Sequence, residues 1–168
     1  MTEHFDIDAL TDLSKEFARR FLARFPALVS ACSSESIEGI PGRHLRIHVD
    51  SPAGPDRNVT IWMNGGDEPS LGFGTGGWHT HDDYTREVEP GLCRDESLLD
   101  LLQAILEDQF VVFEEPDAAP RPFCSVLDLR NPNALLEELT SPHCSKRVRI
   151  KTFTGRNDRE VALDDVEG

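Results

Sequence analysis

The fold is decided by residues 44–63, which read HLRIHVDSPAGPDRNVTIWM. Apolar and polar side chains alternate over residues 44–50 and alternate again over residues 59–63. A period of two places the apolar side chains on one face of a strand, and the prolines and glycine between the two segments are typical of a turn. The stretch therefore predicts two antiparallel strands that bury one face.

Similar signals extend the sheet along the chain. We expect further strands at residues 70–74, 110–113, 123–127, 148–153 and 160–163, where β-branched and aromatic residues gather between turn residues. Residues 30–42 are expected to form a connector. Because neighbouring strands follow one another through tight turns, the order favours an antiparallel or mixed sheet over a doubly wound parallel one.

Apolar residues with helical spacing predict three helices. In residues 8–25 they recur every three or four positions, and Pro26 ends the pattern. A second helix, capped by Asp95, carries a leucine-rich stripe to position 106, and a short third helix occupies residues 131–139. The expected fold is a single α+β domain over residues 1–168, with an antiparallel or mixed sheet of about six to seven strands and three helices.

Charge and composition exclude several functions. The 168 residues contain 31 acidic and 17 basic side chains, for a formal charge of -14. Such a chain repels phosphate backbones and anionic headgroups, so we expect neither nucleic-acid nor membrane binding. No apolar stretch approaches the ~20 residues of a membrane span, and the acidic start does not look like a signal peptide. A cytoplasmic protein is expected, with its four cysteines as thiols.

The most unusual segment in the chain is Trp78-His79-Thr80-His81-Asp82-Asp83-Tyr84, which follows a glycine-rich approach. Two histidines separated by one residue can direct both imidazoles at one metal ion, and a carboxylate two positions later can complete the set. Aromatic and histidine side chains on a loop are also typical of recognition surfaces. The binding residues expected from this segment are Trp78, His79, His81, Asp82, Asp83 and Tyr84.

The run from His79 to Tyr84 resembles the H-x-H-x-D-H signature of metallo-β-lactamase-fold hydrolases. It departs from that signature at Tyr84, which replaces the last histidine, and the chain is short for that four-layered fold. The alternative interpretation is a metal-dependent hydrolase, in which His79, His81 and Asp83 are the ligands of a divalent transition metal such as zinc.

A second resemblance covers more of the chain. The N-terminal amphipathic helix, the strands that end at residues 77–81 and the leucine-rich helix at residues 98–106 look like small acidic bacterial immunity proteins, which neutralise toxins. This resemblance implies a non-catalytic protein that binds and blocks a partner, and it implies neither cofactor nor catalytic residue.

Charge distribution is consistent with a basic partner. Residues 82–117 contain twelve acidic residues against only Arg86 and Arg94. Negative charge can steer association with a basic protein. The leading interpretation is an immunity-like inhibitor whose contact surface combines the acidic residues 82–115 with residues 78–84. The alternatives are a metal-dependent hydrolase and a domain with a purely structural role.

Overall fold

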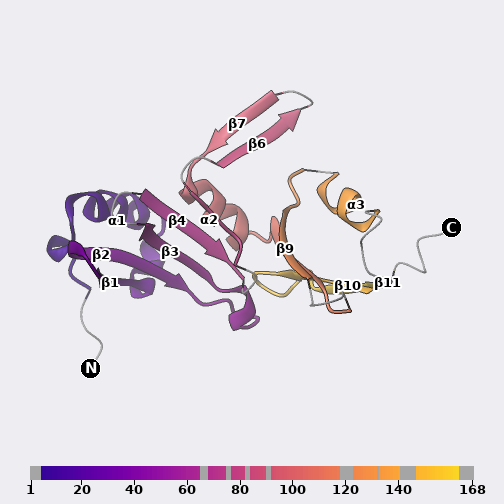
Figure 1. Cartoon of the computed structure of the whole chain (residues 1–168), viewed down its shortest axis with the longest axis horizontal. Helices are drawn as coiled ribbons and strands as arrows, with labels where there is room; N and C mark the ends of the chain where they lie inside the picture. The colour runs from indigo at the N-terminus through magenta and orange to yellow at the C-terminus, as the bar shows by residue number, and fades with distance from the viewer. Residues whose placement is uncertain are drawn as a thin grey trace.

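The computed structural model describes residues 5–64, 68–74, 77–81, 84–89, 92–117, 123–131, 133–140 and 147–162. These residues form eleven strands in three sheets, with three α-helices and three short 3-10 helices (Figure 1). The prediction of one antiparallel or mixed sheet of about six to seven strands with three helices is therefore wrong. Sheet dominates the fold, and the largest sheet among the described residues has five strands.

Four strands do not follow from the apolar pattern, and they account for most of this error. They are β1 (Cys32–Ile37), β5 (His79–His81), β6 (Tyr84–Glu89) and β7 (Leu92–Glu96). β1 and β5 are the edges of the five-stranded sheet, and β6 and β7 pair only with each other. Strands at a sheet edge or in a separate hairpin are held by backbone hydrogen bonds and need no alternation of buried and exposed side chains.

The five-stranded sheet has the order β1-β2-β3-β4-β5 and is antiparallel throughout. Its central strands are β2 (Ile40–Val49), β3 (Val59–Asn64) and β4 (Glu68–Phe73). The alternation in residues 44–63 holds, since Leu45, Ile47, Val49, Val59, Ile61 and Met63 are all buried. This inner face packs in one core cluster with residues of the two longer helices.

Those helices are α1 (Asp12–Arg24) and α2 (Leu98–Leu106). Phe17 and Phe21 of α1 are buried, and the Arg24 guanidinium pairs with Asp100 of α2 at 2.7 Å. The expected cap of α2 was wrong. Asp95 lies in β7, and the capping box is formed by Ser97 and Asp100, whose side chains each accept a hydrogen bond from the other's backbone N–H.

The four-stranded sheet has the order β11-β10-β8-β9. Its strands are β8 (Phe110–Glu115), β9 (Phe123–Asp128), β10 (Arg147–Thr152) and β11 (Arg159–Ala162). The apolar run at the start of β8 is buried on both faces: Phe110 and Val112 belong to the main core, whereas Val111 and Phe113 form a second core with Val148 and Ile150. Leu135 and Leu139 of α3 (Ala134–Leu139) pack against this second core.

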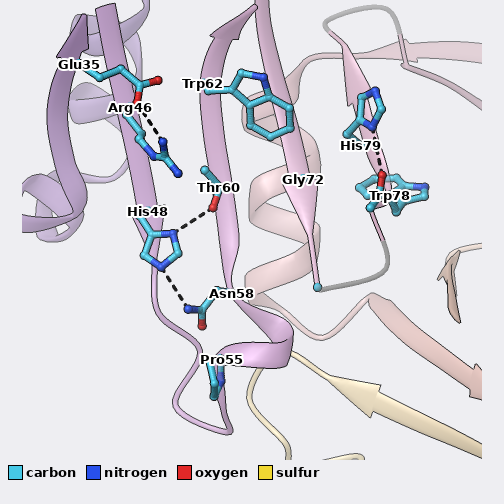
Figure 2. A pocket seen from close by; sticks show the side chains of 12 residues that line it. Glu35, Arg46, His48, Pro55, Asn58, Thr60, Trp62, Gly72, Trp78 and His79 are labelled. Carbon is cyan, nitrogen blue, oxygen red and sulfur yellow. Dashed lines mark hydrogen bonds and ion pairs between the residues drawn. The ribbon is translucent and has the colours of Figure 1, made fainter. Parts of the chain in front are cut away.

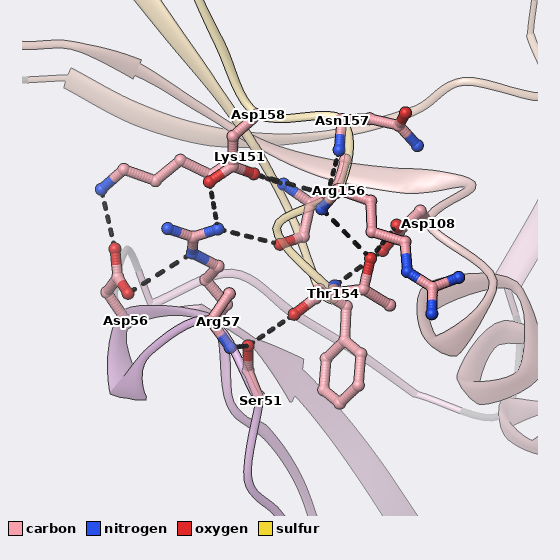
Figure 3. Close-up of polar contacts among 12 residues, drawn as sticks. Ser51, Asp56, Arg57, Asp108, Lys151, Thr154, Arg156, Asn157 and Asp158 are labelled. Atoms are coloured by element: carbon pink, nitrogen blue, oxygen red, sulfur yellow. Dashed lines mark hydrogen bonds and ion pairs between the residues drawn. The ribbon is translucent and has the colours of Figure 1, made fainter.

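A polar joint, built around the buried side chain of Arg57, connects the two larger sheets (Figure 3). Arg57 ends the short 3-10 helix η3 (Pro55–Arg57), which lies between β2 and β3, and is 8% exposed. Its Nη1 donates to the Thr152 carbonyl oxygen at 3.2 Å and to the carboxylate of Asp158. Lys151 Nζ bridges Asp56 and Glu114 at 2.7 and 2.8 Å. The joint therefore fixes the β2–β3 connection against β10 and the turn that follows it.

The hairpin of β6 and β7 projects from the rest of the molecule (Figure 1). An ion pair and a hydrogen bond connect its base to the end of β9 and the turn that follows it. Glu96 is 8% exposed and lies between Arg86, at 2.9 Å, and Arg130, at 2.8 Å. The Tyr84 hydroxyl donates to Asp128 at 3.3 Å.

Among the described residues, no helix is both long and apolar enough to span a membrane.

Candidate functional site

The outer face of the five-stranded sheet, which points away from α1 and α2, carries a cavity of about 630 Å³ (Figure 2). We use "outer face" for Arg46, His48, Thr60, Trp62, Gly72 and His79, all of which line the cavity. The strand register explains why they meet. Arg46 is opposite Trp62, and His48, Thr60, Gly72 and His79 form one row across four strands.

Trp62 is the main apolar group of this face. A Cβ atom placed on Gly72 would lie 3.1 Å from Trp62 Cζ3 and 3.3 Å from Cη2, so the glycine is what allows the indole to lie against β4. The centre of the His79 ring is 6.2 Å from that of Trp62. Figure 2 shows the indole with one ring face turned outward from the sheet. The arrangement is an aromatic platform on an open polar surface.

His48 is held by hydrogen bonds on both ring nitrogens. Nδ1 lies 2.9 Å from Thr60 Oγ1, and Nε2 lies 3.1 Å from Asn58 Nδ2. The Asn58 side chain is oriented by the Ser51 N–H, which donates to its Oδ1 at 2.8 Å, and its Nδ2 also donates to Asp50 Oδ1 at 3.0 Å. His48 Nε2 also lies 3.3 Å from Asp50 Oδ1, so the ring is held between Thr60, Asn58 and Asp50.

Two carboxylates accompany these side chains. Glu35 Oε2 pairs with Arg46 Nη1 at 2.9 Å, and this ion pair holds the guanidinium beside β1. Asp50 follows β2 directly, and its side chain is 84% exposed. With Glu35 and Arg46 compensating each other, Asp50 leaves this part of the sheet with a negative charge.

The structure brings only part of the predicted site together. Trp78 and His79 line the cavity, with Trp78 also packed against Phe110 at 6.1 Å between ring centres. The His81 ring is 5.6 Å from that of His79, and its Nδ1 lies 2.8 Å from Ser70 Oγ. Asp82 and Asp83 lie outside the described residues.

Tyr84 does not contribute to the cavity. Its ring packs on Phe110, 6.3 Å between centres, and its hydroxyl bonds to Asp128. Burial, and then the negative charge of Asp128, raise the pKa of Tyr84 to about 12. Tyr84 therefore supports the base of the β6–β7 hairpin.

Among the described residues, no group of three or more His, Cys, Asp and Glu side chains is arranged so that it could hold a metal ion. His79 Nδ1 lies 3.1 Å from the Gly77 carbonyl oxygen. A carbonyl oxygen only accepts, so His79 Nδ1 is the donor in this hydrogen bond. His79 and His81, at alternate positions of β5, face the same side of the sheet.

Four of the acidic residues in the segment 82–115 make ion pairs or hydrogen bonds within the molecule. Glu96 is buried between two arginines, Glu114 pairs with Lys151, and Asp108 accepts from the Thr154 N–H at 2.8 Å. Asp100 is bonded by Arg24 and then by Ser97, and these bonds lower the pKa of its carboxyl. These four carboxylates therefore stabilise the fold, which reduces what this segment offers to a partner.

Sequence reasoning missed Trp62, His48, Asn58 and Arg46. One signal for them was available. In the alternation of residues 59–63, Trp62 takes an outward position, where a large aromatic side chain is exceptional among polar neighbours. The hydrogen bonds from Asn58 to His48 depend on strand register, which a single sequence does not provide.

No family model, curated protein or solved structure matches this chain.

Proposed function

We propose that the chain is a non-catalytic protein-binding domain, an immunity-like inhibitor, that contacts its partner through the outer face. The observation that carries this proposal is the platform at Trp62, fixed over Gly72 and flanked by His79 on an open sheet. Trp is the residue type most enriched among the side chains that dominate protein interfaces. Its polar neighbours, such as His48, are already held by internal hydrogen bonds, so little side-chain freedom is lost on binding.

Charge supports a basic partner. The chain carries a net charge of -14, and Asp50 adds an exposed carboxylate beside the outer face. Long-range attraction of this kind raises the association rate and weakens with added salt. A basic partner with an electropositive working surface, such as a nuclease, is the target that this charge fits best.

The test uses a partner that co-purifies with the chain and is then prepared separately. We expect Trp62→Ala to raise the Kd for this partner at least about tenfold, the range of an interface hot spot. Leu136→Ala is the matched control, because Leu136 lies on α3, away from the outer face, and is 58% exposed. Equal affinities of the Trp62→Ala variant and the wild type, with unchanged circular dichroism, would refute the proposal.

A metal-dependent hydrolase is the second candidate, favoured by His79 and His81, whose ring centres lie 5.6 Å apart on the same side of β5. A bound ion would lower the pKa of a coordinated water and generate the nucleophile. Elemental analysis of the wild type beside the His79→Ala/His81→Ala double variant tests it. One equivalent of metal in the wild type alone would favour this candidate, and metal in neither would reject it.

A further inference from the structure

We propose that Trp62 receives the guanidinium group of an arginine side chain from the basic partner. This inference rests on the proposed function and names the chemistry that the outer face recognises. An arginine head group stacks its planar, delocalised charge on an aromatic face, and an indole is the best of the aromatic acceptors.

Three contacts of this kind occur among the described residues. Arg20, Arg24 and Arg130 place their guanidinium carbons 5.9, 5.5 and 5.1 Å from the ring centres of Phe17, Phe25 and Phe110. Within the described ranges no arginine or lysine lies over Trp62 in this way, although an indole attracts a cation more strongly than a phenyl ring does. The strongest acceptor on the sheet thus remains available to a partner.

Arg46 is the cation nearest to Trp62 by strand register, and it is engaged elsewhere. It lies directly opposite Trp62 across the β2–β3 pair, but its guanidinium is bound to Glu35 at 2.9 Å. This ion pair compensates its charge, so it offers limited repulsion to an incoming cation.

The position of the indole favours a ligand that comes from solvent. Its six-membered ring rests against Gly72, so one edge is fixed by the sheet while a ring face is turned outward (Figure 2). Gly72 shares its row with His48, and Asp50 lies two positions beyond His48, at about 7 Å along the strand. The Asp50 carboxylate lies 3.3 Å from His48 Nε2 and accepts from Asn58 Nδ2. Because it is also 84% exposed, it adds an attractive field for a cation on this platform.

The experiment is an NMR titration of the wild-type chain labelled with ¹⁵N-tryptophan. The chain has two tryptophans, so the spectrum contains two indole N–H signals, and the Trp62→Phe variant assigns them. One probe is the peptide Gly-Arg-Gly-Arg-Gly, and the second is its citrulline counterpart, which keeps the shape and hydrogen-bonding groups but lacks the charge. We expect the arginine peptide to shift the Trp62 signal saturably, with a Kd at least about fivefold lower than that of the citrulline peptide.

Charge variants refine this test. Asp50→Asn should raise the Kd of the arginine peptide by roughly two- to fivefold at low salt. Glu16→Gln removes the same charge from the exposed side of α1 and should leave the Kd within about 1.5-fold. Equal Kd values for the arginine and citrulline peptides, or no shift of the Trp62 signal, would overturn the inference.

The two proposals fail in different ways. If Trp62→Ala weakens the reconstituted partner complex but the arginine peptide leaves the Trp62 signal unmoved, the outer face binds the partner by other chemistry and only this inference is wrong. If Trp62→Ala leaves the partner complex intact, the proposed function is wrong as well, whatever the peptides do.

Discussion

Replacing Arg57 by methionine tests whether the polar joint around this residue holds the two larger sheets together. The substitution keeps an apolar stem of similar length but removes the guanidinium, which donates to the Thr152 carbonyl and to Asp158. A charge-assisted bond contributes about 1.5–3 kcal/mol, and the bond to the carbonyl contributes about 1 kcal/mol. Asp158 is a third exposed and still accepts from the Thr152 N–H at 2.8 Å, which offsets part of the loss.

We therefore expect Arg57→Met to lower the free energy of unfolding by about 2–4 kcal/mol. Arg149→Met is the control, because Arg149 and Glu160 form an ion pair in which both side chains are more than 40% exposed. Loss of such a surface pair costs about 0–1 kcal/mol. Urea unfolding followed by circular dichroism measures both variants. If the two substitutions lowered the free energy of unfolding equally, the joint would not be a principal source of stability.

Three further predictions follow from single sites. Tyr84 is the only tyrosine, so absorbance at 295 nm should show one ionisation, with a pKa of about 12. Because the folded pKa is raised, the contribution of Tyr84 to stability, discounted to about 1 kcal/mol for a half-exposed group, should be lost as pH rises from 10 through 12. A midpoint near pH 10 would contradict the burial of the hydroxyl beside Asp128. Burial raises the pKa of the Cys32 thiol to about 11. Alkylation of this thiol at pH 8, followed by peptide mass spectrometry, should therefore be much slower in the native chain than in urea. Equal alkylation rates would contradict the burial of Cys32. Gly72→Ala should displace the Trp62 indole and raise the Kd for the partner severalfold, while the free energy of unfolding changes by less than about 1 kcal/mol. An unchanged Kd would show that the position of the indole is unimportant for binding.

Elements with a strong apolar period could be predicted from the sequence. The segments in which helices are expected contain α1, α2 and α3, and the inner face of β2 and β3 matches the alternation in residues 44–63. β1, with the sequence CSSESI, has no such alternation, because it is an edge strand that pairs only with β2. The division into three sheets depends on pairings between distant segments, such as β8 with β10, which local periodicity does not encode.

The candidate site was predictable only in part, for a related reason. Trp78 and His79 stand out in composition, and both line the cavity. The residues that complete the outer face lie on β2 and β3, and they meet His79 only through the register of four strands. The pairing of the acidic residues could not be predicted either, because formal charge does not reveal it: Glu96 is buried between two arginines instead of facing solvent.

The central claim is that the outer face is the contact surface, and hydroxyl-radical footprinting of the reconstituted complex tests it most directly. The oxidation rate of each side chain is measured by mass spectrometry with and without partner. We predict that the rates at Trp62, His48 and His79 fall severalfold in the complex, while the rate at the exposed Leu136 does not change. Unchanged rates at Trp62 and His79, with protection elsewhere on the chain, would contradict the account.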